Sequence, residues 1–169
     1  MTTLKKTLDS THGFLTAFWA SFGVAILGAA LIDEDPVQFL SEYWLVAVMF
    51  VLTIYGSSYL LGMRAFAFEK VKTNPFLSVL AAFLVSELVL GFGVFAGGLG
   101  HVILEVVRGN FSQVNIFEDV IGMTGVFMMF GVMFTTPLAL GLGLNVWIRE
   151  RLLAKKSARE AMDVTDIMS

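Results

Sequence analysis

The 169-residue chain contains no cysteine. Its absence excludes disulfide bridges, thiol redox relays and cysteine-ligated zinc or iron–sulfur centres. Charge is also scarce, because only 15% of the residues are Asp, Glu, Lys or Arg, against about 25% in globular proteins. The net charge is −3, and no basic stripe could follow a phosphate backbone. Nucleic acid is therefore not an expected partner.

Apolar residues are abundant instead, at 57% of the chain, and the mean hydropathy is +0.81. A soluble domain of this size has too little interior to bury so much apolar surface, so we predict an integral membrane protein. A helix needs about 20 residues to cross the hydrocarbon core. Four segments qualify as spans: Phe14–Ile32, Trp44–Met63, Phe76–Val107 and Val120–Ile148.

The predicted fold is an all-α, four-helix membrane bundle with short loops, in one domain (1–169) that ends in a helical tail (149–169). Asn74-Pro75 is a typical helix start, with a capping side chain before a proline at the first helical position. Asp35-Pro36 has the same form and predicts a short helix, Val37–Tyr43, ahead of the second span. Pro137 predicts a kink in the fourth span.

Basic residues predict the orientation, because they favour the cytoplasmic side. Ten of the 11 Lys and Arg residues flank the spans on one side, Arg108 being the exception. We therefore expect the plasma (bacterial inner) membrane, with both termini in the cytoplasm. Aromatic residues near span ends fit an interfacial belt: Trp19, Tyr43, Trp44 and Trp147. The segment 64–72 alternates bases with Phe66 and Phe68, which predicts an interfacial segment.

Glu87 lies near the middle of the third span, where an ionised carboxylate costs at least about 2.5–3.5 kcal/mol. One hypothesis makes it a proton- or cation-binding group; the other makes it a protonated structural group that hydrogen-bonds a neighbouring helix. Its expected partners at similar depth are Thr53, Tyr55 and Thr135. Helical periodicity places a polar, glycine-containing stripe on its face, running toward the outer surface: Gly91, Val94, Gly98, His101, Glu105 and Arg108.

His101, Glu105 and Arg108 are spaced to touch on one helix face. We interpret them as an external polar cluster closing the top of the third span. A metal site there would need further ligands, such as Asp33 or Glu34, and we predict no metal and no cofactor. The only other histidine, His12, lies about 30 Å away across the membrane, so the two cannot clasp one haem. One-sided ligation of a pigment by His101 stays open.

Small residues mark helix contacts in membranes, because lipid gives no hydrophobic force between helices. We expect packing faces at Ala17, Ser21 and Ala25 in the first span and at Gly93, Gly97 and Gly100 in the third. These faces serve either internal packing or contact with another subunit.

No motif points to catalysis, since no acid, base and nucleophile gather at one depth. The leading hypothesis is a non-enzymatic membrane subunit that assembles with itself or with other membrane proteins in the lipid bilayer. The alternative is a small oligomeric proton-coupled transporter or channel that uses Glu87 as its titrating group.

Overall fold

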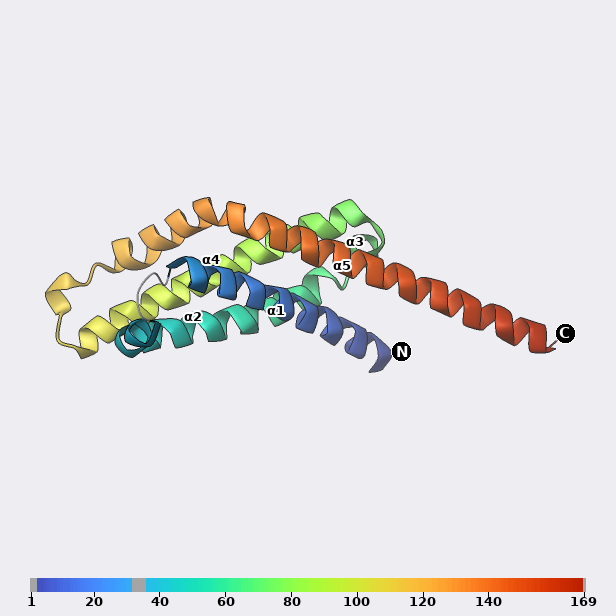
Figure 1. Ribbon diagram of the computed structural model, residues 1–169, viewed down its shortest axis with the longest axis horizontal. Helices are drawn as coiled ribbons and strands as arrows, with labels where there is room; N and C mark the ends of the chain where they lie inside the picture. Colours follow the sequence, from blue (N-terminus) through green and yellow to red (C-terminus); the bar gives the residue numbers. More distant parts are fainter. Residues whose placement is uncertain (1–2, 32–35, 169) are drawn as a thin grey trace.

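A computed structural model describes residues 3–31 and 36–168. Its elements are α1 (Thr3–Leu31), α2 (Pro36–Ala65), α3 (Glu69–Thr73), α4 (Pro75–Val107), the 3-10 helix η1 (Phe111–Gln113), the π-helix η2 (Phe117–Gly122) and α5 (Met123–Met168). No strand occurs in this part of the chain, which confirms the all-helical prediction. Figure 1 shows an elongated molecule in which α5 continues well past the other helices.

Three helical segments are long and apolar enough to cross a membrane: Ser41–Ala65, Pro75–Val107 and Phe117–Arg159. They correspond to the second, third and fourth predicted spans. The first predicted span, Phe14–Ile32, falls on α1 and is not among the three; its end lies outside the described residues.

The helix boundaries follow local sequence signals. Asn74 caps α4 as predicted: its side-chain oxygen accepts hydrogen bonds from the backbone N–H groups of Phe76 (2.9 Å) and Leu77 (3.3 Å). At the other end of α4, Gly109 adopts φ +83°, which favours glycine. The Asn110 N–H then bonds back to the Glu105 carbonyl at 2.9 Å, so the helix ends there.

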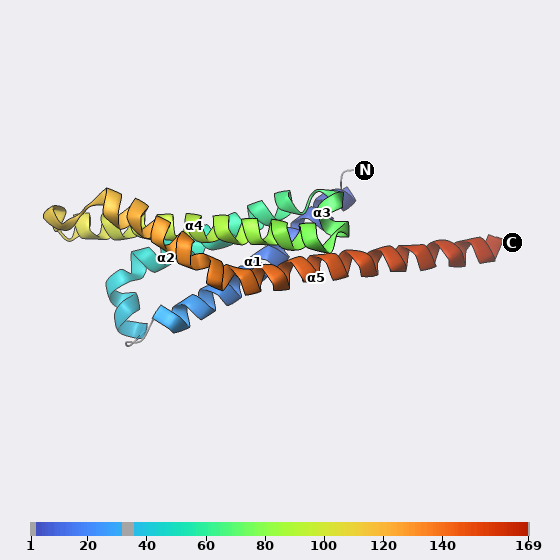
Figure 2. The same cartoon turned by 90° about the horizontal axis from the view of Figure 1, so that it is seen from above.

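Two predicted breaks take different forms. The short helix expected over Val37–Tyr43 is joined to the second span within α2, but Tyr43 has non-helical angles (φ −120°, ψ 27°) and marks a kink at the predicted boundary. Pro137 lies inside a continuous α5. Figure 2 shows this helix changing direction in its orange part before a straight run to the C-terminus.

The helices pack in a defined order, with α4 between α2 and α5, and α1 mainly against α2. Glycines allow the closest approaches: a Cβ at Gly143 of α5 would lie 2.5 Å from Val79 Cα of α4. The core has two buried clusters, one around Ala82, Leu142 and Val146 and one around Ile54, Val85 and Val89.

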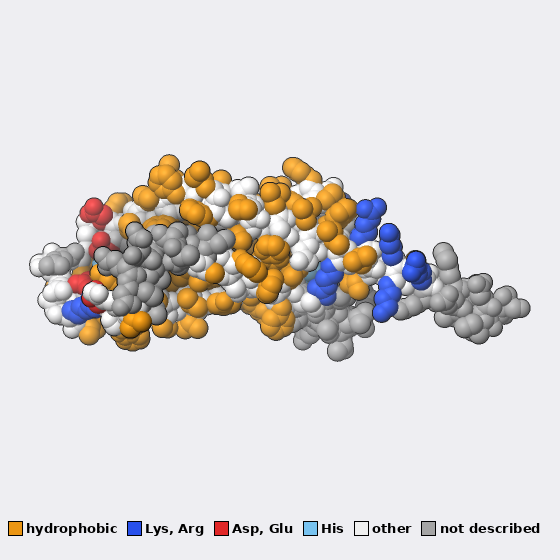
Figure 3. All heavy atoms as spheres, viewed as in Figure 1, with side chains coloured by type: hydrophobic (Ala, Val, Ile, Leu, Met, Phe, Trp, Pro, Cys, Tyr) orange, Lys and Arg blue, Asp and Glu red, His pale blue; other side chains and the backbone are white. Residues whose placement is uncertain are grey.

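Charge separates along the long axis (Figure 3). Lys and Arg gather where α5 leaves the body, and Asp and Glu gather at the opposite end. We call these the basic end (Arg64, Lys70, Lys72, Arg149 and Arg151) and the acidic end (Glu42, Glu105, Glu118 and Asp119). The surface between them is largely apolar.

Phe66 differs from its prediction. It was expected at the membrane interface, but its side chain is 0% exposed and belongs to the buried cluster of Ala82 and Leu142. Phe68, two residues later, is 68% exposed. The turn between α2 and α3 rotates the chain here, so the alternation expected from the sequence is lost.

Candidate functional site

Glu87 lies on α4 where that helix faces α5. The helix begins at Pro75, so Glu87 is about 18 Å from the start of a helix about 50 Å long. Its carboxylate oxygen Oε1 accepts a hydrogen bond from the Thr135 hydroxyl of α5. Thr135 is buried and Glu87 is half-buried. The contact therefore joins two helices across the apolar middle of the molecule.

Glycine at position 131 of α5 brings the two backbones together beside this contact. A Cβ there would collide with the Leu90 side chain of α4 and would lie 3.7 Å from Glu87 Oε2. The close approach lets the short Thr135 side chain reach the carboxylate one turn further along α5.

Of the three partners predicted for Glu87, the structure brings only Thr135 to it. Tyr55 lies 2.8 Å from the Ser21 hydroxyl instead. Because Ser21 donates its own proton to the Ala17 carbonyl (3.0 Å), Tyr55 is the donor in that pair. No hydrogen bond joins Thr53 to Glu87; its backbone carbonyl accepts from Ser57 at 2.6 Å.

The stripe expected to reach Glu87 from the outer surface is covered by protein at two points. A Cβ at Gly91 would lie 3.1 Å from the Met128 sulfur, and one at Gly98 would lie 3.0 Å from the Asp119 carbonyl of η2. The two glycines therefore receive α5 and η2. Helical periodicity gives the face on which the stripe lies but not its neighbours, and at these two glycines the neighbours are α5 and η2.

At the acidic end, the predicted cluster connects α4 to the kink in α2. Arg108 donates to Glu105 Oε1 at 3.0 Å, and Asn110 donates to Glu105 Oε2 at 2.7 Å. The centroid of the Tyr43 ring lies 6.3 Å from the centroid of the His101 ring. The same Tyr43 centroid lies 6.0 Å from the guanidinium carbon of Arg108. Arg108 also donates to the Glu42 backbone carbonyl of α2, so the cluster joins α4 to α2 beside the kink.

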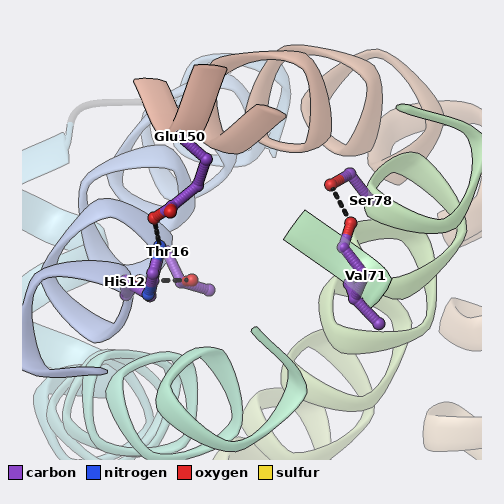
Figure 4. Close-up of polar contacts among 5 residues, drawn as sticks. All are labelled: His12, Thr16, Val71, Ser78 and Glu150. Atoms are coloured by element: carbon purple, nitrogen blue, oxygen red, sulfur yellow. Dashed lines mark hydrogen bonds and ion pairs between the residues drawn. The ribbon is translucent and has the colours of Figure 1, made fainter. Parts of the chain in front are cut away.

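His12 belongs to a second polar contact, at the basic end, that the sequence did not suggest. Its Nε2 lies 3.0 Å from Glu150 Oε1 of α5, and its side chain is 0% exposed. One turn along α1, Thr16 donates to the His12 backbone carbonyl at 2.8 Å. Figure 4 shows these residues facing the interior between the helices. The pairing partner is 138 positions away, so no local spacing could reveal it.

Burial holds the pKa of His12 below its ordinary value, and the nearby Lys72 acts in the same direction. The Glu150 carboxylate opposes this effect through its charge and its hydrogen bond. An ionised carboxylate oxygen can only accept, so Nε2–H donates to Glu150. At the same end, Ser78 of α4 donates to the Val71 carbonyl of α3 at 2.5 Å and fixes that short helix (Figure 4).

The predicted packing residues occupy different surroundings. A Cβ at Gly93 would lie 2.6 Å from Ile54 Cγ1, and one at Gly100 would lie 3.1 Å from the Leu45 carbonyl, so this face of α4 packs on α2. Gly97 has more room, with Val46 Cγ1 at 3.6 Å. On α1, Ala17 is half-buried and Ala25 is exposed.

Trp19 also departs from its prediction. It was expected in an interfacial belt, but its indole ring packs on Gly141 of α5 and its Nε1 atom is buried. The inward side of this ring is therefore in contact with α5, far along the chain.

The described residues contain no group of three His, Asp or Glu side chains that could hold a metal ion. Asp33 and Glu34, the extra ligands considered for His101, lie outside the described residues. No protein-family model matches the chain, and no curated protein or solved structure matches it either.

Proposed function

We propose that the chain is a non-enzymatic subunit of the bacterial inner membrane that assembles with itself or with other membrane proteins. In this proposal the segment Phe14–Ile32 on α1 joins the other three spans in a four-helix bundle, and the basic end lies in the cytoplasm with both termini. Support for the orientation comes from the charge separation along the long axis (Figure 3).

The observation that carries the assembly proposal is the exposed part of α5 beyond the body of the molecule. The helix has 46 residues and is therefore about 69 Å long, whereas the hydrocarbon core is about 30 Å thick. Every residue from 151 to 159 is exposed. Leu152 is 61% and Leu153 is 38% exposed on this segment. A partner that covers these leucines would remove their apolar surface from water and stabilise the extension.

The assembly proposal is tested by the mass of the complex extracted from its native membrane in mild detergent. We expect the wild type to exceed the monomer mass and the double variant Leu152→Ser/Leu153→Ser to lose the additional mass. Phe68→Ser is the matched control, since Phe68 is an exposed apolar residue at the same end but off α5. A wild-type monomer, or equal loss in the control, would contradict the proposal.

Orientation has its own test. Reporter tags at either terminus should be accessible only from the cytoplasm, and a probe at Gln113 should be accessible only from outside. A C-terminus reached from outside would reverse the assignment of both ends.

A second candidate function, a small oligomeric proton-coupled transporter or channel, is favoured by the Glu87–Thr135 contact. A carboxyl group in the middle of a span is costly and rare outside functional sites. Glu87→Gln keeps the shape and removes the titratable proton. In proteoliposomes with an imposed pH gradient, this variant should abolish proton flux, whereas Glu105→Gln at the end of the same helix should retain it. Wild-type vesicles without flux above empty vesicles would count against this candidate.

A further inference from the structure

A partly open cavity of about 50 Å³ is lined by all four long helices. Most of the lining is apolar. The polar side chains in the lining come from three different spans and from α1: Thr16, Trp19, Ser58, Ser86 and Thr135.

Two polar atoms of this lining have no hydrogen-bond partner among the described residues: Ser58 Oγ and Trp19 Nε1. Ser58 is 0% exposed. The neighbouring Ser57 shows the ordinary arrangement, because its hydroxyl donates to the Thr53 carbonyl at 2.6 Å. An unpaired buried polar group costs about 1–3 kcal/mol, so both atoms need a partner that the protein itself does not supply.

Water meets this need in size and in chemistry. A buried water requires about 10–15 Å³ and two to four polar neighbours, and the cavity of about 50 Å³ exceeds that requirement. No carboxylate lines the cavity, and the Trp19 N–H is a donor only, which disfavours a bound cation.

We propose that this cavity is a water-binding site and that its water connects Trp19 and Ser58 to Glu87 through the Thr135 hydroxyl. Thr135 lines the cavity and donates its proton to Glu87 Oε1. Its oxygen can still accept a hydrogen bond from water. Trp19 can only donate, so the water accepts from Trp19 and donates to Thr135. The hydrogen bonds then all run toward the Glu87 carboxylate.

The hydrated cavity depends on neither proposed function, because a structural and a titrating Glu87 both gain from the connection. It does place the polar surroundings of Glu87 on the side of α1 and α2. Nearer the acidic end, α4 packs against Met128 at Gly91 and against η2 at Gly98.

The experiment measures magnetisation transfer from water to tryptophan indole N–H groups, by solid-state NMR on ¹⁵N-labelled full-length protein in lipid bilayers. The chain has only three tryptophans, and the single variants Trp44→Phe and Trp147→Phe assign their signals. We expect transfer to the Trp19 indole in the wild type. Ser58→Val fills the cavity and removes its hydroxyl, so this transfer should fall at least fivefold.

Ser57→Val is the matched control, because Ser57 is adjacent in sequence but does not line the cavity; Trp19 should keep its water signal. Ser58→Ala removes a polar partner without adding volume, so it keeps the test valid if the valine variant fails to fold. We expect it to reduce the Trp19 signal about twofold. A wild-type Trp19 without water transfer, an unchanged signal in both Ser58 variants, or an equal loss in Ser57→Val would overturn the proposal.

Discussion

Replacing Gly93 with alanine should weaken the contact between α4 and α2. The new Cβ would lie 2.6 Å from Ile54 Cγ1, 3.0 Å from Ile54 Cδ1 and 3.2 Å from Phe50 Cε2. The Cγ1 atom is next to the branch point of a buried, β-branched side chain, which cannot simply rotate away. Overpacking of this kind costs about 1–3 kcal/mol.

Gly97→Ala is the matched control, one turn further on the same face of α4. Its nearest contact would be Val46 Cγ1 at 3.6 Å, an ordinary van der Waals distance. Both substitutions share the helix-propensity gain of alanine over glycine, about 0.8–1 kcal/mol. The difference between the variants therefore isolates the collision and should equal about 1–3 kcal/mol.

Thermal unfolding in mild detergent, followed by native-gel mobility, measures the effect. For a chain of this size 1 kcal/mol changes Tm by about 2–4 °C, so Gly93→Ala should unfold about 2–12 °C below Gly97→Ala. The oligomeric state should stay the same, because Gly93 faces α2 of its own chain. Equal Tm values would refute the packing argument. If Gly93→Ala instead released a subunit from the complex without changing Tm, the Gly93 face would be a contact between two chains.

Three further predictions concern the helix cap and the two polar ends. Asn74→Ala should lower the free energy of unfolding by about 0.5–2 kcal/mol because two backbone N–H groups of α4 lose their acceptor, and Asn74→Ser should recover most of it; a thermal melt of both variants checks this. Burial holds the pKa of His12 low, so the folded chain binds fewer protons than the unfolded one. The free energy of unfolding should therefore be highest above about pH 6.5 and should fall as the pH drops below that value. Thermal melts of His12→Gln should show a flatter pH dependence of Tm than the wild type, and parallel curves would contradict this. Arg108→Gln should lower stability by about 1 kcal/mol at most through the pair with Glu105, because the Arg108 side chain is solvent-exposed. A larger loss in the melt would mean that the contacts of Arg108 to α2, at the Glu42 carbonyl and the Tyr43 ring, dominate.

Local signals in the sequence predicted the helix boundaries well. The cap at Asn74 and the kink at Tyr43 depend on a few adjacent residues, whose preferences act wherever the chain lies. Membrane-crossing character depends on the sum of side-chain hydropathies along a segment, and three of the predicted spans have it in the structure. Glu87 was identifiable because a lone carboxylate in an apolar run is rare.

The neighbours of each helix face were decided by the tertiary structure. Lipid and protein interior are almost equally apolar, so hydropathy does not distinguish a side chain that faces lipid from one that is buried. Phe66 was assigned to the interface from its alternation with basic residues and Trp19 from its position near a span end, and both pack inward in the structure. The same limit applies to Tyr55, which bonds to Ser21 rather than to Glu87.

Composition and local pattern thus determined that the chain is helical, apolar enough for a membrane, and charged differently at its two ends. The polar contacts inside it required the fold, because His12–Glu150 and Glu87–Thr135 join residues 138 and 48 positions apart. The rotation of each helix about its axis determines which side chains of neighbouring helices face each other and form such pairs. That rotation is set by close contacts such as Gly143 on Val79, which no single segment contains.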